Sequence, residues 1–497
     1  MKKIKVIIGI LCLCISPLFM SAPLYAQGYG GALTFQGLDH FTLHSAASRA
    51  MAGVSIGIKQ DPGLMFRNPA TLFSIQGLQL SLGGLYFSSE SKQEQNYAPV
   101  RYYTNLSLLL EGLTAYIPDP DTSLFGFTLK DTVQRPFDKI GPNWSRSGKN
   151  SVPLQAMLVV PVSLGEVKIV AGIGTVEYAN LNHYYQNNNV LSPSILSQRP
   201  LPTLRPTDAD PLAVDWSQML RQRKGEIQGY GFALAGGLPD YNLAFGFSGM
   251  ILDGSSDDYE QQLARGKLIF YFDAFRADSV YRRITKTGTS DFSGQEFTLS
   301  SILSSRYVSI GFSIKPPATI TRKYSMQIAT DTTGGGTPSI SSVQGEDKLK
   351  LSWRGMVGLA LTPRENLTIG LEYEFRPYKS VRYTDAQGTE TAPWLQSSLF
   401  RVGAEYQVAP WLALRGGMRG EAEVFEAEGS YIAGEPVTYT VYSAGCGVYY
   451  AGLRLNLTYE NSLMKYQDIW STAISKNSDR RHFLLAQLTY DIPLQVQ

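Results

Sequence analysis

The sequence is poor in cysteine, histidine and charge. It has 3 Cys and 4 His in 497 residues, which argues against a disulfide framework and leaves little material for a metal cluster. Lys and Arg number 44 against 42 Asp and Glu, so the basic excess expected of a nucleic-acid-binding protein is missing. Charged residues are 17% of the chain, below the roughly 25% of an ordinary soluble domain. A coiled coil or helical bundle is therefore not expected.

Residues 1–26 have the pattern of a secretory signal. Lys2, Lys3 and Lys5 precede the apolar run Val6–Ile15, and Pro17–Ala26 leads to an expected cut after Ala26. A lipoprotein would use Cys12 or Cys14 instead, but neither follows a small-residue lipobox. The mature chain then keeps one cysteine, Cys446.

Long apolar runs are missing from the mature sequence. After Ala26 nothing approaches the ~18 consecutive apolar residues of a membrane-spanning helix. An exported chain with no helical anchor is either a soluble secreted protein or an outer-membrane β-barrel.

Period-two alternation dominates the chain after residue 76. From Phe400, one face carries Phe400 and Val402 while the other carries Arg401 and Gly403. A soluble β-sandwich alternates in the same way, with the apolar face turned inward. Strands of about ten residues, aromatics at strand ends, and short turns alternating with long polar segments favour the membrane barrel.

The connections locate the two ends of the predicted barrel. Short turns are expected at Ser163–Glu166, Leu238–Tyr241, Pro363–Asn366, Ala409–Trp411 and Ala451–Gly452, and long segments at Asn180–Gly225, Asp331–Asp347, Thr384–Gln396, Glu421–Pro436 and Gln467–Ser478. Within the first long segment, Asp210-Pro211 favours either a short helix ending near Arg223 or, equally, a solvated loop with a little internal packing. The sequence gives 12 to 16 strand candidates from Gly77 to Tyr490, of which those in 101–130 and 268–300 are ambiguous. An even total is expected.

The segment before the barrel has a different character. Ser48-Arg49-Ala50-Met51-Ala52-Gly53 is followed by Asp61-Pro62 and then by Phe66-Arg67-Asn68-Pro69-Ala70. Pro69 fixes its own φ and pushes Asn68 toward extended backbone, which makes a rigid corner. Asn68 is also able to hydrogen-bond the local backbone, as Asn does in turns.

This pattern resembles the FadL/TodX family of outer-membrane transporters for long-chain fatty acids and other hydrophobic compounds. The resemblance implies an all-β transmembrane barrel of about 14 strands in the bacterial outer membrane, with the lumen closed by an N-terminal hatch. It places the signal peptide at 1–26, the hatch at 27–76, the barrel at 77–491 and a tail at 492–497. The hatch motif would be Asn68, Pro69 and Ala70.

The resemblance also implies capture of the ligand by extracellular loops, transfer to an apolar pocket beside the hatch, and lateral release through the wall. Apolar side chains of the hatch are the candidate lining: Phe35, Phe41, Leu43, Met51, Leu64, Met65, Phe66 and Phe73. Inward-facing arginines form either a satisfied lumen network or partners for a substrate carboxylate: Arg354, Arg376, Arg401, Arg415 and Arg454.

Catalysis is not expected. His40 and His44 have a metal-compatible i, i+4 spacing, but no Glu or Cys accompanies them, and we interpret the pair as chance. His482 is the candidate base of an outer-membrane phospholipase, without an identified nucleophile. No cofactor or metal is predicted.

Two other functions remain open. A barrel of this type could serve as a PorV-type component of a protein-secretion system that binds protein partners, or it could be a diffusion porin filled by its plug. The expected partners are a hydrophobic small molecule, outer-membrane lipid and the barrel-assembly machinery, for which Tyr490 supplies a terminal aromatic despite the tail that follows it. No nucleic-acid partner is expected.

Overall fold

The computed structural model describes residues 31–40, 42–97, 143–164, 167–192, 207–271, 275–278, 282–332, 336–427, 430, 432, 434–469 and 473–493. The expected signal segment, Phe41 and the ambiguous strand candidates in 101–130 lie outside these residues, as do 494–497 of the expected tail. Within them, no helix combines the length and apolar character needed to cross a membrane.

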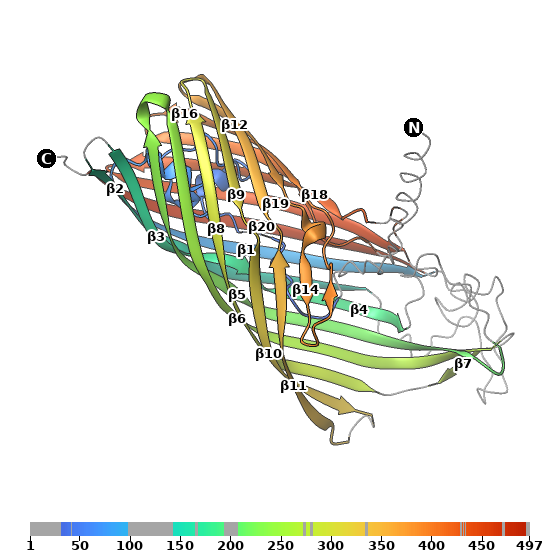
Figure 1. Cartoon of the computed structure of the whole chain (residues 1–497). Helices are drawn as coiled ribbons and strands as arrows, with labels where there is room; N and C mark the ends of the chain where they lie inside the picture. Colours follow the sequence, from blue (N-terminus) through green and yellow to red (C-terminus); the bar gives the residue numbers. More distant parts are fainter. Residues whose placement is uncertain are drawn as a thin grey trace, which may run out of the picture.

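The described strands form one antiparallel sheet (Figure 1). They are β1 (Leu78–Tyr97), β2 (Trp144–Leu164), β3 (Val167–Asn180), β4 (His183–Ser192), β5 (Leu212–Leu238), β6 (Leu243–Phe270), β7 (Phe275–Asp278), β8 (Arg283–Ser304), β9 (Val308–Lys315), β10 (Ala318–Asp331), β11 (Ser339–Leu351), β12 (Arg354–Arg364), β13 (Leu367–Phe375), β14 (Arg382–Thr384), β15 (Glu390–Thr391), β16 (Leu399–Ala409), β17 (Leu412–Ala422), β18 (Thr438–Tyr450), β19 (Leu453–Ile469) and β20 (Ala473–Ile492).

The sheet closes into a barrel of fourteen strands, when segments that continue each other are counted as one strand. Five pairs of segments continue each other across short breaks, namely β3 with β4, β7 with β8, β9 with β10, β11 with β12, and β13 with β14, while β15 forms a small hairpin with β14. The first and last strands pair over their whole length, from Leu78 opposite Ile492 to Tyr97 opposite Ala473. The predicted all-β barrel of about 14 strands is confirmed.

Along each strand, side chains alternate between an apolar outer surface and a polar interior. On β16, Phe400 is 53% exposed and its neighbour Arg401 2%. On β5, Phe232 and Leu234 point outward while Ala233 and Ala235 are buried. A continuous outward apolar face with polar or small residues inside is the arrangement of a transmembrane β-barrel, and it excludes the sandwich alternative.

The strands extend beyond the predicted limits at the end with long connections. The predicted helix from Asp210-Pro211 to Arg223 is wrong: from Leu212 onward that stretch is β5, paired with β6 and, in part, with β4. The local Asp-Pro signal is overridden because hydrogen bonding to two neighbouring strands satisfies the backbone. The apolar alternation that identifies strands fades here, since a strand outside the lipid needs no apolar face.

Residues 31–40 and 42–76, here called the inner segment, lie inside the barrel. Figure 1 shows them in blue within the end of the barrel that carries the C-terminus. The segment contains the helix α2 (Ala46–Ala50) and the 3₁₀ helices η1 (Pro62–Leu64) and η2 (Pro69–Ser74). Helix α2 contacts β17 to β20, whereas η2 contacts β3, β5, β6 and β8, so the segment spans the lumen from wall to wall.

Candidate functional site

Capping residues of the inner segment also attach it to the wall. Ser45 caps α2 by accepting a hydrogen bond from Ser48 N (2.9 Å) and donates to Asp61 at 2.5 Å. Asp61 in turn caps η1 and accepts from the side chain of Gln487 on β20 (2.8 Å). Gln487 also accepts from the backbone N–H of Ala46 (2.7 Å). The backbone N–H groups at a helix start have no acceptor within the helix, and here residues of the barrel wall supply part of what they need.

The Asn68-Pro69-Ala70 turn presses directly on the wall. Ala70 N donates to Ser300 on β8 (2.8 Å), and a Cβ added to Gly246 on β6 would lie 2.2 Å from that same nitrogen. The Asn68 side chain makes no capping bond and approaches Ser55 Oγ at 3.4 Å, so its expected bond to the local backbone is not formed. The turn is shaped by its fit to two strands.

Buried ion pairs join the inner segment to opposite sides of the barrel. Arg67 pairs with Glu372 on β13 at 2.5 Å, and Arg49 pairs with Glu460 on β19 at 2.5 Å. Both carboxylates have side chains with no exposed surface. Buried pairs of this kind fix position, because removing one partner leaves an uncompensated charge.

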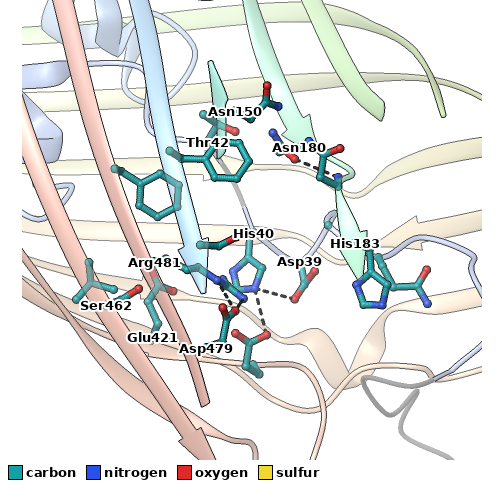
Figure 2. Close-up of a pocket in the computed structure, with 18 of the residues that line it drawn as sticks. Asp39, His40, Thr42, Asn150, Asn180, His183, Glu421, Ser462, Asp479 and Arg481 are labelled. Atoms are coloured by element: carbon teal, nitrogen blue, oxygen red, sulfur yellow. Dashed lines mark hydrogen bonds and ion pairs between the residues drawn. The ribbon is translucent and has the colours of Figure 1, made fainter. Parts of the chain in front are cut away.

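A cavity of about 600 Å³ lies between the inner segment and the wall (Figure 2). Its lining contains ten Arg and Lys side chains against five Asp and Glu, so the lining as a whole is cationic. An apolar part is supplied by Leu85 and Phe87 of β1 and Phe483 of β20, with the two phenyl rings 5.9 Å apart. The cavity is therefore amphipathic.

The eight candidate apolar residues do not form one common lining. Leu43 lines the large cavity, and Leu43, Leu64 and Phe66 line a smaller one of about 60 Å³. Phe35 and Met65 are packed in a core cluster with wall residues, and Phe73 packs against that cluster. Met51 is fully buried in another cluster with Leu64, and Phe41 lies outside the described residues. A ligand role for these residues stays a prediction.

The five candidate arginines all meet carboxylates. Arg376 pairs with Glu374 at 2.8 Å, Arg401 with Glu374 at 2.6 Å, Arg415 with Glu405 at 2.6 Å and Arg454 with Asp491 at 3.6 Å, and Arg354 pairs with Glu296. Arg376 and Arg401 line the large cavity and Arg354 the smaller one. This arrangement favours the network alternative for the five.

The barrel wall contains a gap beside the large cavity. Strands β2 and β3 are paired from Leu164 opposite Val167 as far as Gln155 opposite Val176. Beyond that point β2 pairs with β1 and β4 pairs with β5, and no ladder joins β2 to β4 among the described residues. The pairing of β3 with β5 shifts at Glu177/Ala179, and Val176 to Ala179 are all buried. The strand therefore bends inward at this bulge, away from β2.

Side chains bridge the gap where the backbone does not. The guanidinium of Arg146 on β2 lies 3.8 Å from the ring centre of Tyr184 on β4, and Trp144 meets the same ring at 5.6 Å. Arg146 and Tyr184 both line the cavity. Within the described residues no carboxylate lies within 4.0 Å of Arg146. The sequence did not predict this pair. Its partners are 38 positions apart, and they meet across two strands that share no ladder among the described residues.

The side chains of His40 and His44 contact different groups. His44 donates to the carbonyl of Glu177 at the bulge (2.8 Å), and burial, with smaller contributions from Lys315 and the nearby arginines, lowers the pKa of His44 to about 4. His40 lies 3.3 Å from Asp39 and 3.1 Å from Glu423, just after β17. Burial disfavours the His40 cation, but the two carboxylates outweigh it and raise the pKa to about 9.

Together these features define a class: a β-barrel of outer-membrane type with an N-terminal segment in its lumen, a cavity beside that segment and a gap in the wall. Solved structures share this architecture. A FadL homologue of Pseudomonas aeruginosa is similar with a TM-score of 0.57 and 13% identity, over 92% of this chain and 99% of that one. The CymD monoaromatic hydrocarbon channel gives 0.56 and 12%, over 92% and 100%.

The P. putida toluene transporter TodX is similar with a TM-score of 0.54 and 13% identity, over 91% of this chain and 100% of that one. At such identities the likeness establishes the fold, and the predicted resemblance to FadL and TodX is confirmed at that level. No protein-family model and no curated protein matches the chain.

Proposed function

We propose that this protein takes up hydrophobic small molecules that carry an anionic group, across the outer membrane, and releases them sideways through the gap between β2 and β4. One observation carries the proposal: the cavity beside the inner segment is lined by residues from both edges of that gap, including Arg146 and Tyr184. The solved channels with this fold are named for toluene or monoaromatic hydrocarbons, which supports the hydrophobic part of the ligand.

The cavity chemistry supports an amphiphile. A tail would lie on Leu85, Phe87 and Phe483, since binding pockets combine apolar walls with a few placed polar groups. Most cavity arginines already have carboxylate partners, so Arg146 is the best-placed cation for a carboxylate or similar head, by a charge-assisted hydrogen bond. A neutral hydrocarbon would leave Arg146 without an anionic partner among the described residues.

The height of the gap supports lateral release. The paired part of β3 covers ten residues, Val167 to Val176, which at ~3.3 Å each and a tilt near 45° reach about 23 Å above the turn. The apolar band of such barrels is about 25 Å tall. The gap would thus open near the outer edge of the lipid, where an amphiphile can leave without crossing water.

The inner segment would act as the hatch, with the predicted limits 27–76 and the Asn68-Pro69-Ala70 turn as its contact with β6 and β8. A fourteen-stranded barrel needs such filling, because wide barrels otherwise enclose an aqueous channel. Hydrogen bonds and ion pairs to β13, β19 and β20 support a segment that stays docked while ligand passes beside it.

Closing the gap tests the exit route. Arg146→Cys/Tyr184→Cys, made in a Cys446→Ser background, would be joined with a short bismaleimide in cells, and uptake of a fluorescent long-chain carboxylate measured. The matched control is Tyr442→Cys/Asn461→Cys, whose positions face each other on the continuous β18–β19 ladder. We expect cross-linking to lower uptake for the first pair alone. Undiminished uptake through the cross-linked gap would remove lateral release from the proposal.

The ligand itself is tested by mass spectrometry of small molecules extracted from the detergent-purified barrel, compared with a variant lacking 27–76. An amphiphile retained by the full chain and lost from the variant supports uptake. Co-purification of a protein partner, with no compound beyond bulk lipid, would favour the secretion component, and an empty, conducting barrel would favour the porin.

A further inference from the structure

A cluster of three side chains joins the start of the inner segment to the far wall of the large cavity. Asp39 and His40 come from the inner segment, and Glu423 follows directly after β17. One ligand-type atom from each lies within 4.8 Å of the other two. Figure 2 shows the His40 ring beside Asp39, joined to it by a dashed line, and the same ring nitrogen lies 3.1 Å from Glu423 Oε2.

We propose that Asp39, His40 and Glu423 form a binding site for a divalent transition-metal ion such as Zn²⁺, which ties the inner segment to the barrel. One imidazole with two carboxylates is a donor set that suits zinc and disfavours a hard ion that demands oxygen ligands throughout. This site is independent of the uptake proposal.

The distances fit such a site. Ligand atoms 2.0–2.1 Å from a tetrahedral zinc are about 3.4 Å apart. His40 Nε2 lies 3.3 Å from Asp39 Oδ2 and 3.1 Å from Glu423 Oε2, so small side-chain movements would place an ion between them. The His40 side chain is 35% exposed, toward the cavity, which leaves an open position for a water molecule.

An unsatisfied buried atom points to the same ligand. The Glu423 side chain is 3% exposed, and its Oε1 is buried with no hydrogen bond of normal geometry in the described chain, although the Tyr439 hydroxyl is close enough to favour the charged carboxylate. A buried carboxylate oxygen that lacks a well-formed hydrogen bond costs free energy unless something positive meets it. A metal ion in the cluster would supply that charge.

Two features oppose binding and set its limits. His40 Nε2 now faces both carboxylates at hydrogen-bonding distance, so an ion must displace the proton shared there, and binding releases a proton. Arg481, whose guanidinium pairs with Asp479 at 2.6 Å, adds positive charge beside the cluster. We therefore expect micromolar affinity at neutral pH, weaker than that of a structural zinc site.

The test is a zinc titration of the untagged mature chain in detergent, stripped with chelator and monitored with a competing chromogenic chelator. We expect one Zn²⁺ per chain and a rise in melting temperature on binding. His40→Ala, Glu423→Gln and Asp39→Asn should each weaken binding at least tenfold, while His183→Ala, a histidine on the same cavity, should leave it unchanged.

Folding of each variant is checked by heat-modifiable gel migration, and any one folded variant of the three suffices for the comparison. Absence of stoichiometric Zn²⁺ binding would overturn the proposal. Equal binding in the folded cluster variants would also overturn it, because the ion would then lie elsewhere. So would a preference for Ca²⁺ over Zn²⁺, because that indicates oxygen ligands alone.

Discussion

At the scale of single residues, Glu372 joins the inner segment to the wall through several hydrogen bonds. It accepts hydrogen bonds from Arg67 at 2.5 Å, from Arg401 at 3.2 Å and from both the backbone and the hydroxyl of Ser55 at 2.8 and 2.9 Å. Glu372 is buried, with 1% of its surface exposed. Arg67 and Arg401 therefore share this buried carboxylate, with Glu374 as a second one at 3.7 and 2.6 Å respectively.

Glu372→Gln should lower the free energy of unfolding by about 3 kcal/mol, because it removes one of the two buried carboxylates that meet Arg67 and Arg401. Urea unfolding of the refolded barrel measures this. Glu365→Gln makes the same chemical change in an ion pair with Arg306 whose side chains are 91% and 72% exposed, and it should cost less than about 0.5 kcal/mol. Equal losses in the two variants would contradict the anchoring role of Glu372.

His44 should make stability depend on pH. Burial is the main cause of its pKa of about 4 against an ordinary 6.5, and Lys315, Arg49 and Arg67 add to the effect. Since the folded-state pKa lies below the unfolded one, the contribution of His44 is complete above pH 6.5 and is lost as the pH falls from 6.5 to 4. His44→Gln should therefore lower the melting temperature at pH 7.5, with a difference from wild type that shrinks by pH 4.5. A constant difference would argue against titration of His44.

At the scale of elements, the edges of β2 and β4 that face the gap should be the weakest part of the wall. No ladder joins these two strands in the part of the chain that the structure describes, whereas β19 has a ladder on both sides. Hydrogen–deuterium exchange should be faster in His183–Ser192 than in Leu455–Ser462. Equal protection of the two segments would mean that the gap is closed in solution.

The contact between η2 and β6 depends on a glycine. Because a Cβ at Gly246 would lie 2.2 Å from Ala70 N, Gly246→Ala should shift the Asn68-Pro69-Ala70 turn and cost about 1–3 kcal/mol. Gly236→Ala on β5, where the nearest heavy atom is 4.0 Å away, serves as the control. Limited proteolysis of residues 31–76, alongside urea unfolding, reports the change. An intact, protease-resistant inner segment in Gly246→Ala would contradict the packing argument.

The strands in contact with lipid were predictable because lipid imposes a strict rule on every second residue, as Phe400 and Arg401 illustrate. The outer parts of β5 and β6 obey no such rule and were missed. Side-chain pairings inside the lumen were also beyond the sequence: Arg49 meets Glu460 and His40 meets Glu423 across more than 380 positions. Such partners follow from barrel register, which no local pattern encodes.

At the scale of the whole molecule, the inner segment should decide whether the barrel conducts. Removal of 27–76 should produce a folded barrel with a large ionic conductance in planar bilayers, because the wall alone encloses a wide lumen. The full chain should conduct little, and heat-modifiable migration confirms that both forms fold. A silent barrel after the deletion would show that strands or loops close the lumen without the inner segment.

The docking contacts of the inner segment also constrain how the protein is made. Ala46 binds Gln487 across a separation of 441 positions, and Arg49 binds Glu460 across 411, so residues that emerge first from the ribosome find their partners among the last. Loop closure over such distances cannot precede the final hairpin. The inner segment must therefore stay undocked until β20 pairs with β1. Closure of the barrel and docking of the inner segment then become a single late event in biogenesis.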